Sequence, residues 1–384
     1  LVTSIWLPET TDANANAAIK PKGNGANVAQ DPDGTTTGGN ARGEYATDWQ
    51  KLRSNAAQVA SGNYSIISGG NNNTASSTNS IAIGTGNTAS GAFAGTAIGR
   101  SNTASGSGAT AIGTSNNSSG IRSAIGGGFS NVSSGSHSTI GGGENNTASS
   151  DRSTIGGGGN NTASGNSFAT ISGGASNLAD GPVSTIGGGV NNRTNGNRAT
   201  IGGGENNTAS GSHSTVSGGN RGQAYSYGQS ALASGRFAAS GDAQVSQIIS
   251  RREADLTTGG TTTLHLDGSS INFAFDTANK AANILAEWVA VVESITGTAT
   301  GVSVGDVVAQ DDLFLLKEVG GVMSIVGSVT NTATKNDTSQ ATASMGYSTG
   351  GTELDITFTG ATFSGGGTLT YRIVHRIIMV EVGF

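Results

Sequence analysis

Cysteine is absent from this chain of 384 residues, and proline is nearly so. Without cysteine there is no disulfide framework, no thiolate metal ligand and no cysteine nucleophile. Only 4 prolines accompany 64 glycines. The chain is therefore not a collagen, which needs abundant proline beside a glycine at every third position, and not a proline-rich linker. Its glycine must serve another repeating structure.

Charged residues and long apolar runs are also scarce. Charged residues make up 11% of the sequence and the formal net charge is −6, which leaves no basic surface for nucleic acid. No run approaches the ~18 apolar residues of a membrane helix. We therefore expect neither a nucleic acid partner nor insertion into a membrane.

The sequence does contain a repeat, over residues 61–241. In each copy a branched apolar residue precedes Gly or Ser-Gly, and successive copies lie 13 to 16 residues apart. The full copy reads S-T-I-G-G-G-x-N-N-T-A-S-G. The residues that anchor the copies, and that we expect to form the core, are Ile67, Ile83, Ile98, Ile112, Ile125, Ile140, Ile155, Ile171, Ile186, Ile201 and Val216, with Leu232 closing the series.

Two short strands and two turns account for each copy. Ser153, Thr154 and Ile155 alternate in size and polarity, and a period of two marks a half-buried strand. The glycines after the anchor and the pair Asn145-Asn146 tolerate the left-handed backbone of a tight turn. A second small buried position follows at Ala148, and Ser-Gly then closes the coil. The pattern predicts a parallel β-solenoid with turns of ~15 residues, about 4.8 Å apart, and asparagine ladders along its turns.

The predicted core of one turn is small. One Ile and one Ala per turn offset little of the ~1–2 kcal/mol that ordering each residue costs. A single solenoid would be marginally stable. We therefore expect the chain to self-associate, with three-fold closure as the natural arrangement for a fibre.

One copy of the repeat resembles a known family. Residues 79–91 read N-S-I-A-I-G-T-G-N-T-A-S-G, which resembles the head repeat of trimeric autotransporter adhesins. The resemblance covers residues 61–241, roughly half the chain. It implies a homotrimeric, left-handed parallel β-roll.

The segment before the repeat, residues 1–60, resembles a second family. Pro21-Lys22-Gly23, the run G-G-N-A-R-G at 38–43 and Asp48-Trp49-Gln50 precede the first copy. This order is similar to that of bacteriophage tail fibres. The resemblance implies that residues 1–60 form the entry to the trimer and attach it to other tail or baseplate proteins.

The composition changes at residue 242. Glycine becomes rarer, and stretches with a period of two, such as Leu369–Val382, are separated by turn signals. The stretch Ala281–Ile295 has enough alanine for a helix, but Trp288 and the valines around it favour a strand. Short strands punctuated in this way predict a β-sandwich over residues 242–384.

The region 242–384 is also where we expect binding. Residues 264–270 and 371–384 resemble the domain that follows such repeats in tail fibres. Loops on a rigid scaffold often carry function. We therefore expect the loops 296–312 and 330–351 to contact a receptor.

Acidic residues are few in the repeat. A glycosidase needs two carboxylates ~5–9.5 Å apart, and residues 61–241 contain only Glu144, Asp151, Asp180 and Glu205. Glu144 and Glu205 occupy the same position four turns apart, so ~19 Å separates them. A pairing of Asp151 with Glu144 stays open. We interpret all four as solvated surface charges.

The remaining candidates for chemistry have simpler interpretations. The segment Asp31-Pro32-Asp33-Gly34 fits a β-turn better than a calcium turn. His137 and His213 share the position three residues before an anchor, where we expect exposed side chains, and His265 and His375 fall in predicted strands, where we expect packing. We expect no catalytic residue, no metal site and no cofactor, and hence no enzyme.

The function that these features favour is structural and adhesive. We expect a homotrimeric phage tail fibre, located extracellularly in the virion tail, whose solenoid supports a tip that binds a glycan or protein of the host surface. Repeated weak contacts by three copies would add up. The alternatives are a bacterial trimeric autotransporter passenger, a fibre attached to the capsid head, and a glycan depolymerase.

Overall fold

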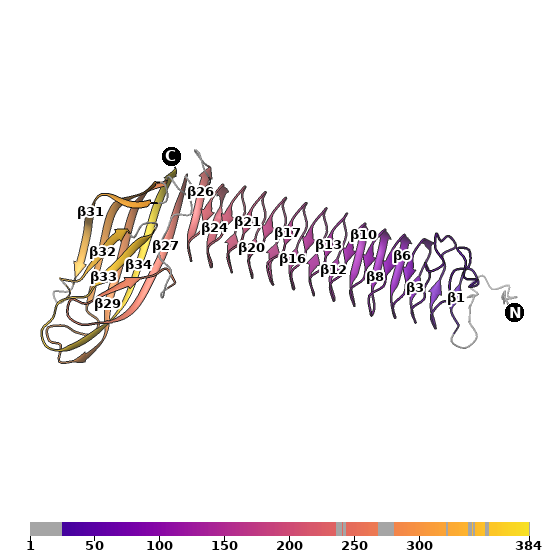
Figure 1. The fold of residues 1–384 in the computed structure, drawn as a ribbon, viewed down its shortest axis with the longest axis horizontal. Coiled ribbons are helices and arrows are strands. Elements are labelled where there is room, and N and C mark those ends of the chain that lie inside the picture. The colour runs from indigo at the N-terminus through magenta and orange to yellow at the C-terminus, as the bar shows by residue number, and fades with distance from the viewer. Residues whose placement is uncertain are drawn as a thin grey trace, which may run out of the picture. The chain divides into compact units, whose positions relative to one another are not determined.

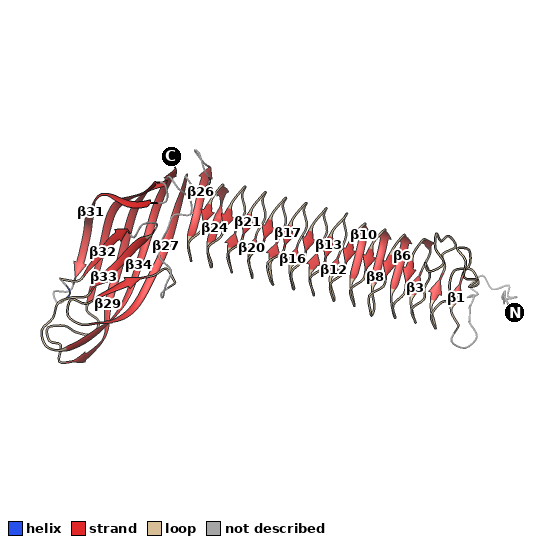
Figure 2. Ribbon diagram, in the orientation of Figure 1, coloured by secondary structure: helices blue, strands red, loops and turns tan. Residues whose placement is uncertain are grey.

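The computed structural model describes residues 25–235, 240, 243–267, 280–319, 322–336, 340, 342–349 and 353–383. The motif Pro21-Lys22-Gly23 lies outside them. The described residues form strands and turns without any α-helix (Figure 2). None of them belongs to a helix long and apolar enough to cross a membrane. The prediction of an all-β chain with a β-solenoid is confirmed, and the solenoid has about 13 turns.

The chain divides into two units, Leu1–Ser149 and Ser150–Phe384. The first unit consists of parallel strands in which each pairs with its equivalent one turn further along. One sheet contains β1 (Asn27–Val28), β2 (Thr47–Asp48), β3 (Ile66–Ile67), β4 (Gly70–Asn71), β6 (Ile81–Thr85), β8 (Thr96–Arg100), β10 (Thr110–Thr114), β12 (Ala124–Ile125) and β14 (Thr139–Ile140). The other contains β5 (Thr74–Ala75), β7 (Thr88–Ala89), β9 (Thr103–Ala104), β11 (Asn117–Ser118), β13 (Val132–Ser133) and β15 (Thr147–Ala148).

The second unit begins with further turns of the same kind (Figure 1). Their strands again pair in parallel, position for position. One sheet contains β16 (Thr154–Ile155), β18 (Thr170–Ile171), β20 (Thr185–Ile186), β22 (Thr200–Ile201), β24 (Thr215–Asn220) and β26 (Ser230–Gly235). The other contains β17 (Thr162–Ala163), β19 (Leu178–Ala179), β21 (Arg193–Thr194), β23 (Thr208–Ala209) and β25 (Gln223–Ala224).

The structure corrects the expected core position by one residue in three turns. Ile83, Ile98 and Ile112 are only half-buried, and the alanines before them fill the interior. Ala111 is fully buried and pairs with Ile125, which fixes the register. The strands of these turns continue past the buried alanine, so the next side chain points outward. The remaining anchors are fully buried: Ile67, Ile125, Ile140, Ile155, Ile171, Ile186, Ile201 and Val216.

A similar shift occurs at the last turn. Val216 pairs with Ala231, which is 2% exposed, whereas Leu232 is 58% exposed. Leu232 therefore does not close the core series. It points outward from β26 instead.

The interior also holds a polar ladder. The backbone amide of Asn192 donates to Asn177 Oδ1 at 3.0 Å, and the Asn192 side chain donates to the carbonyls of Gly188 and Gly204, both at 2.9 Å. Buried asparagines repeat this arrangement from turn to turn, so the predicted ladders exist, inside the coil. The turns thus bury asparagine in addition to their aliphatic side chains.

The stack includes turns before residue 61. β2 pairs in parallel with β3, and Asp48 lies beside Ile67 in the buried row. Two arginines surround this carboxylate: Arg42 Nε lies 2.9 Å and Arg53 Nη2 3.3 Å from Asp48 Oδ2, with all three side chains at most 1% exposed. In this turn a buried ion cluster therefore stands at the position that Ile67 fills in the next one.

An antiparallel sheet follows the solenoid within the second unit. Its first strand pairs with β26, so it continues the edge of the solenoid sheet. The pairing order runs β27, β34, β29, β30, β31. These strands are β27 (Ala243–Leu256), β34 (Gly367–Gly383), β29 (Lys280–Gly297), β30 (Val307–Val319) and β31 (Val322–Asn336).

A three-stranded antiparallel sheet packs on the inner face of this one. Trp288 meets Phe358 edge-on at 5.8 Å between ring centroids, and Phe358 meets Tyr371 at 5.1 Å. Aromatic side chains thus join the two layers. The strands of the smaller sheet are β28 (Thr261–Leu264), β33 (Leu354–Thr359) and β32 (Ser344–Thr349).

Candidate functional site

The four acidic residues of the repeat are exposed. Asp180 lies 3.6 Å from Arg193 and accepts a hydrogen bond from Ser164 Oγ. Glu205 accepts hydrogen bonds from Asn206 and Asn220. These contacts are typical of surface side chains.

The segment that could have been a calcium turn is closed by its own hydrogen bonds. Asp33 Oδ1 accepts from the Thr35 amide, the Thr35 hydroxyl and the Gly38 amide at 2.8, 2.8 and 3.0 Å. The Thr35 amide contributes most to lowering the Asp33 pKa. No group of three or more potential ligands that could hold a metal ion occurs among the described residues.

His375 lies at the centre of a buried polar network. Ser250 Oγ is 3.2 Å from its Nδ1 and Tyr347 Oη 3.1 Å from its Nε2. The Tyr347 hydroxyl donates to Asp312 Oδ2 at 3.1 Å, and Trp288 Nε1 donates to the same oxygen at 3.2 Å. Burial lowers the pKa of His375 to about 3. The histidine is therefore neutral at physiological pH and joins the strands that supply these side chains.

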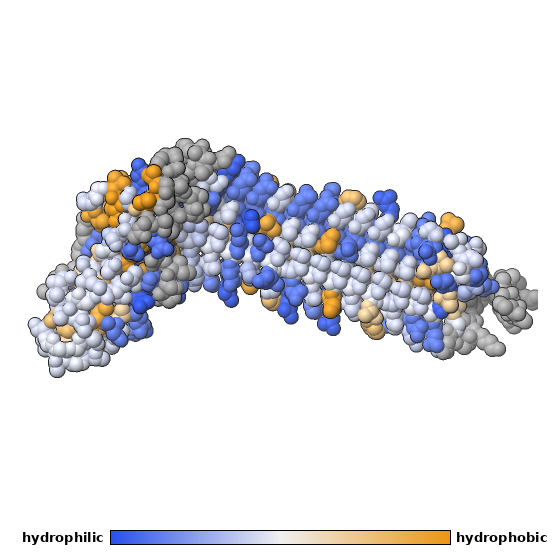
Figure 3. Space-filling model, in the orientation of Figure 1, coloured by the Kyte–Doolittle hydropathy of each residue, from blue (hydrophilic) through white to orange (hydrophobic). Residues whose placement is uncertain are grey.

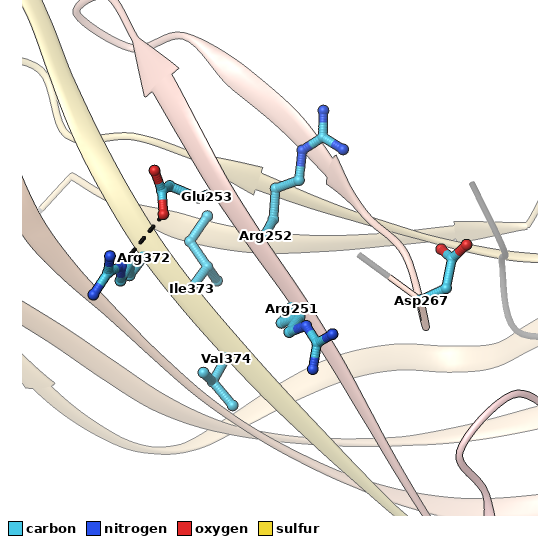
Figure 4. Close-up of a pocket in the computed structure, with 7 residues that line it drawn as sticks. All are labelled: Arg251, Arg252, Glu253, Asp267, Arg372, Ile373 and Val374. Carbon is cyan, nitrogen blue, oxygen red and sulfur yellow. Dashed lines mark hydrogen bonds and ion pairs between the residues drawn. The ribbon is translucent and has the colours of Figure 1, made fainter. Parts of the chain in front are cut away.

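A surface pocket lies on the antiparallel sheet (Figure 4). Its volume is about 350 Å³. Ile373 is buried at its apolar side, and Arg372 Nε lies 3.3 Å from Glu253 Oε2. Three arginines and two acidic residues line the pocket. The lining residues are Arg251, Arg252, Glu253, Asp267, Arg372, Ile373 and Val374.

The predicted contact loops are shorter than expected. Within 296–312, only 298–306 lies between β29 and β30. Within 330–351, residues 330–336 belong to β31 and 344–349 to β32. Residues 337–339, 341 and 350–351 lie outside the described part of the chain. Neither loop contributes to the charged pocket.

The sequence reasoning missed this pocket because its residues come from three separate segments. Arg251 and Val374 are opposite one another on β27 and β34, although more than a hundred residues separate them in the chain. The strand period was visible in both segments, but nothing in either one indicated that they pair. The doublet Arg251-Arg252 was the one local signal.

Comparisons with known proteins give distant similarities only. No family model matches the chain, and no curated protein matches its sequence. The chain is similar to the solved tailspike protein of Acinetobacter baumannii phage AM24 at 9% identity and a TM-score of 0.26, over 83% of this chain and 58% of that one. It is similar to the tailspike protein of Acinetobacter phage vB_ApiP_P1 at 10% identity and a TM-score of 0.21, over 88% and 82%.

A third similar structure concerns enzyme activity. It is a tailspike protein of Acinetobacter baumannii bacteriophage Fri1, described as a capsular polysaccharide depolymerase, at 8% identity and a TM-score of 0.19, over 83% of this chain and 63% of that one. The chain thus spans less than two thirds of the AM24 and Fri1 proteins. Likeness this distant transfers no function.

The depolymerase among these structures contradicts the prediction that the chain is not an enzyme. That prediction counted carboxylates in residues 61–241 alone. Glu253 and Asp267 of the pocket lie outside that range. The scarcity of acids in the repeat therefore does not exclude glycan cleavage.

Proposed function

We propose that the chain is a structural protein of a phage tail that attaches the virion to polysaccharide on the host surface. Residues 61–241 act as a shaft, residues 242–384 form a β-sandwich that binds the receptor, and residues 1–60 contact other tail or baseplate proteins. The observation that carries this proposal is the charged pocket on the strands that follow the solenoid.

The pocket has the chemistry of a saccharide site. Pockets of ~300–1,000 Å³ are large enough for small ligands. Planar guanidinium groups donate pairs of hydrogen bonds to carboxylates and to neighbouring hydroxyls. Glu253 and Asp267 can accept from sugar hydroxyls, and Val374 offers an apolar contact to a sugar ring.

We also propose that three copies assemble, the state implied by the resemblance to trimeric adhesin heads. Support comes from an aliphatic row on the outer face of the antiparallel sheet. Val245 lies opposite both Leu232 and Val380, and Leu315 lies opposite Val326. Asn283 of β29 joins the two halves of the row, since it pairs with both Val380 and Leu315. Residues directly opposite in a sheet share a face.

The outer face of the antiparallel sheet carries a patch of exposed aliphatic side chains. Hydrophobic residues gather over β31 in Figure 3, whereas the solenoid surface carries single ones. Exposed aliphatic side chains on neighbouring strands form the kind of apolar patch that marks an interaction site. They are Leu232, Val245, Ile249, Val289, Leu313, Leu315, Val326 and Val380.

Binding to encapsulated cells tests the function. The labelled full chain should bind encapsulated bacteria of a susceptible host and should not bind capsule-free mutants of the same strain. Arg251→Glu reverses a charge of the pocket and should weaken binding at least about tenfold. Arg100→Glu, an exposed arginine of the first unit, is the matched control.

Equal binding to capsule-free cells would refute the proposed function. An unchanged affinity of Arg251→Glu would place the receptor site elsewhere. The same incubation, assayed for newly formed reducing ends, shows whether the bound polysaccharide is also cleaved.

A further inference from the structure

Each turn between Arg152 and Arg221 has two corners with a residue in the left-handed backbone region. In the turns of the second unit the φ angles at both corners lie between 53° and 62°. The Asn/Ser corner comprises Asn160, Ser176, Asn191, Asn206 and Arg221. The bulky corner comprises Arg152, Phe168, Val183, Arg198 and His213.

The two corners make the same demand on the backbone, so their residues can be compared directly. Asn enters the left-handed region at low cost, whereas bulky residues do so rarely and a β-branched residue such as Val183 is an outlier. Gly228 occupies the bulky corner of the next turn, so glycine is compatible with it. Apart from Arg221, the residues of the Asn/Ser corner suit the left-handed backbone. The bulky corner keeps strained side chains, and such strain is typical of functional sites.

The bulky corners are held one above another. The amide of Phe168 donates to the Asp151 carbonyl, that of Val183 to Ser167 and that of Arg198 to Pro182, each at 2.9 Å. This ladder spaces the corners by the ~4.8 Å of neighbouring parallel strands. The side chains at the bulky corner therefore form a row of fixed period.

The row is exposed, and it combines flat apolar groups with cations. Phe168 is 48% and Val183 42% exposed. The Arg152 guanidinium lies 5.3 Å from the centroid of the Phe168 ring. The His213 ring lies 5.0 Å from that of Tyr227, the residue before Gly228. The first unit uses the equivalent corner in the same way, since Tyr45 and Tyr64 stack there at 5.0 Å.

A saccharide chain matches this chemistry. The C–H faces of a pyranose pack on aromatic rings, and guanidinium groups donate to hydroxyls and carboxylates. One sugar of an extended polysaccharide advances by about the spacing of the turns. The row carries two guanidinium groups, those of Arg152 and Arg198, beside the single carboxylate of Asp151. This local excess of positive charge contrasts with the net charge of −6 of the whole chain. We propose that the bulky corner from Arg152 to His213 binds a linear, acidic polysaccharide that lies along successive turns.

The choice of a polysaccharide rests on the proposed function, and the row is a second site apart from the charged pocket. Its test uses polygalacturonate as an acidic probe and dextran as a neutral one. The full chain with Phe168→Asn, Val183→Asn and Arg198→Asn should bind polygalacturonate at least about tenfold more weakly. Its melting temperature should rise, because Asn relieves the left-handed strain.

Arg221→Asn at the Asn/Ser corner is the control and should leave the affinity unchanged. Preference for polygalacturonate over dextran should diminish as salt rises. The inference is overturned if the triple variant keeps its affinity, or if it loses affinity and stability together. It is also overturned if the unaltered chain binds host capsule but not polygalacturonate, a result that leaves the proposed function standing. Binding of polygalacturonate through the row without any capsule binding would refute the proposed function instead.

Discussion

Tyr347 Oη lies 3.1 Å from His375 Nε2, and the direction of this hydrogen bond follows from its neighbours. Tyr347 donates its proton to Asp312, which as a carboxylate can only accept. The phenol oxygen must then accept from His375 Nε2–H. Nδ1 is left as the acceptor for the hydroxyl of Ser250. One neutral tautomer of His375 therefore satisfies the whole network.

The neutral state of His375 predicts a dependence of stability on pH. Its folded pKa of about 3 lies below the ordinary 6.5, so between these values the unfolded chain binds a proton that the folded chain does not. The contribution is fully present above pH 6.5 and is lost as the pH falls toward 3, on the order of a few kcal/mol in total. We expect the free energy of unfolding, measured with urea, to fall with pH more steeply than in His375→Gln. Equal slopes in both proteins would contradict this assignment.

A register prediction follows from the correction in the early turns. Ala111→Asp should prevent native folding or cost several kcal/mol, because it places a charge in the sealed interior. Ile112→Asp should cost much less, since Ile112 is half-buried. Thermal unfolding followed by circular dichroism distinguishes the two. The reverse order of stability would restore the isoleucine as the core residue.

The solenoid could be predicted from sequence because its signal repeats. One short strand has little information, but the same spacing in successive copies averages out the ambiguity of each. The register could not be predicted as well, because I-A-I-G offers both Ala82 and Ile83 as the inward residue. The prediction chose Ile83 as the inward residue because it is the more hydrophobic of the two. In the structure, pairing with the neighbouring strands turns Ala82 inward instead.

Tertiary pairing explains what remained hidden elsewhere. Asp48 stands at a position that other turns fill with an aliphatic residue, because Arg42 and Arg53 converge on it. That turn lacks the sequence repeat, so it could not be recognised from the pattern. Ala281–Ile295 was correctly assigned to a strand, β29, yet its neighbours β34 and β30 could not be chosen from sequence. The charged pocket depends on such a pairing. The bulky corner was visible in part, as the shared position of His137 and His213 before an anchor.

The ion cluster around Asp48 gives a further prediction. Asp48→Asn should destabilise the first turns by about 3–5 kcal/mol, because two buried guanidinium groups lose their counter-charge. Asp180→Asn removes an exposed partner of Arg193 and should cost at most about 1 kcal/mol. Guanidinium unfolding of both variants measures the difference. Similar losses would mean that the cluster is accessible to water.

The asparagine ladder can be tested within one pair of neighbours. Asn192→Ala removes the donor to Gly188 and Gly204 and the acceptor for the Asn207 amide, so about 2–4 kcal/mol should be lost. Asn191→Gly, at the left-handed corner beside it, should change stability by no more than about 0.5 kcal/mol. Chemical denaturation, analysed with the same dependence on denaturant concentration for both variants, gives the two changes in the free energy of unfolding. A loss from Asn191→Gly as large as that from Asn192→Ala would show that the ladder is not the source of stability.

The outer face of the antiparallel sheet predicts the state of assembly. The unaltered chain should sediment as a trimer, and the double variant Leu313→Asp/Leu315→Asp should sediment as a monomer, because charges would have to be desolvated in the interface. Val304→Asp is the control: Val304 is 63% exposed but lies in the turn between β29 and β30. Circular dichroism should show that both variants keep their strands, since neither position faces the core. A trimeric double variant would mean that the copies associate through the solenoid, and a monomeric unaltered chain would leave this aliphatic face for another partner.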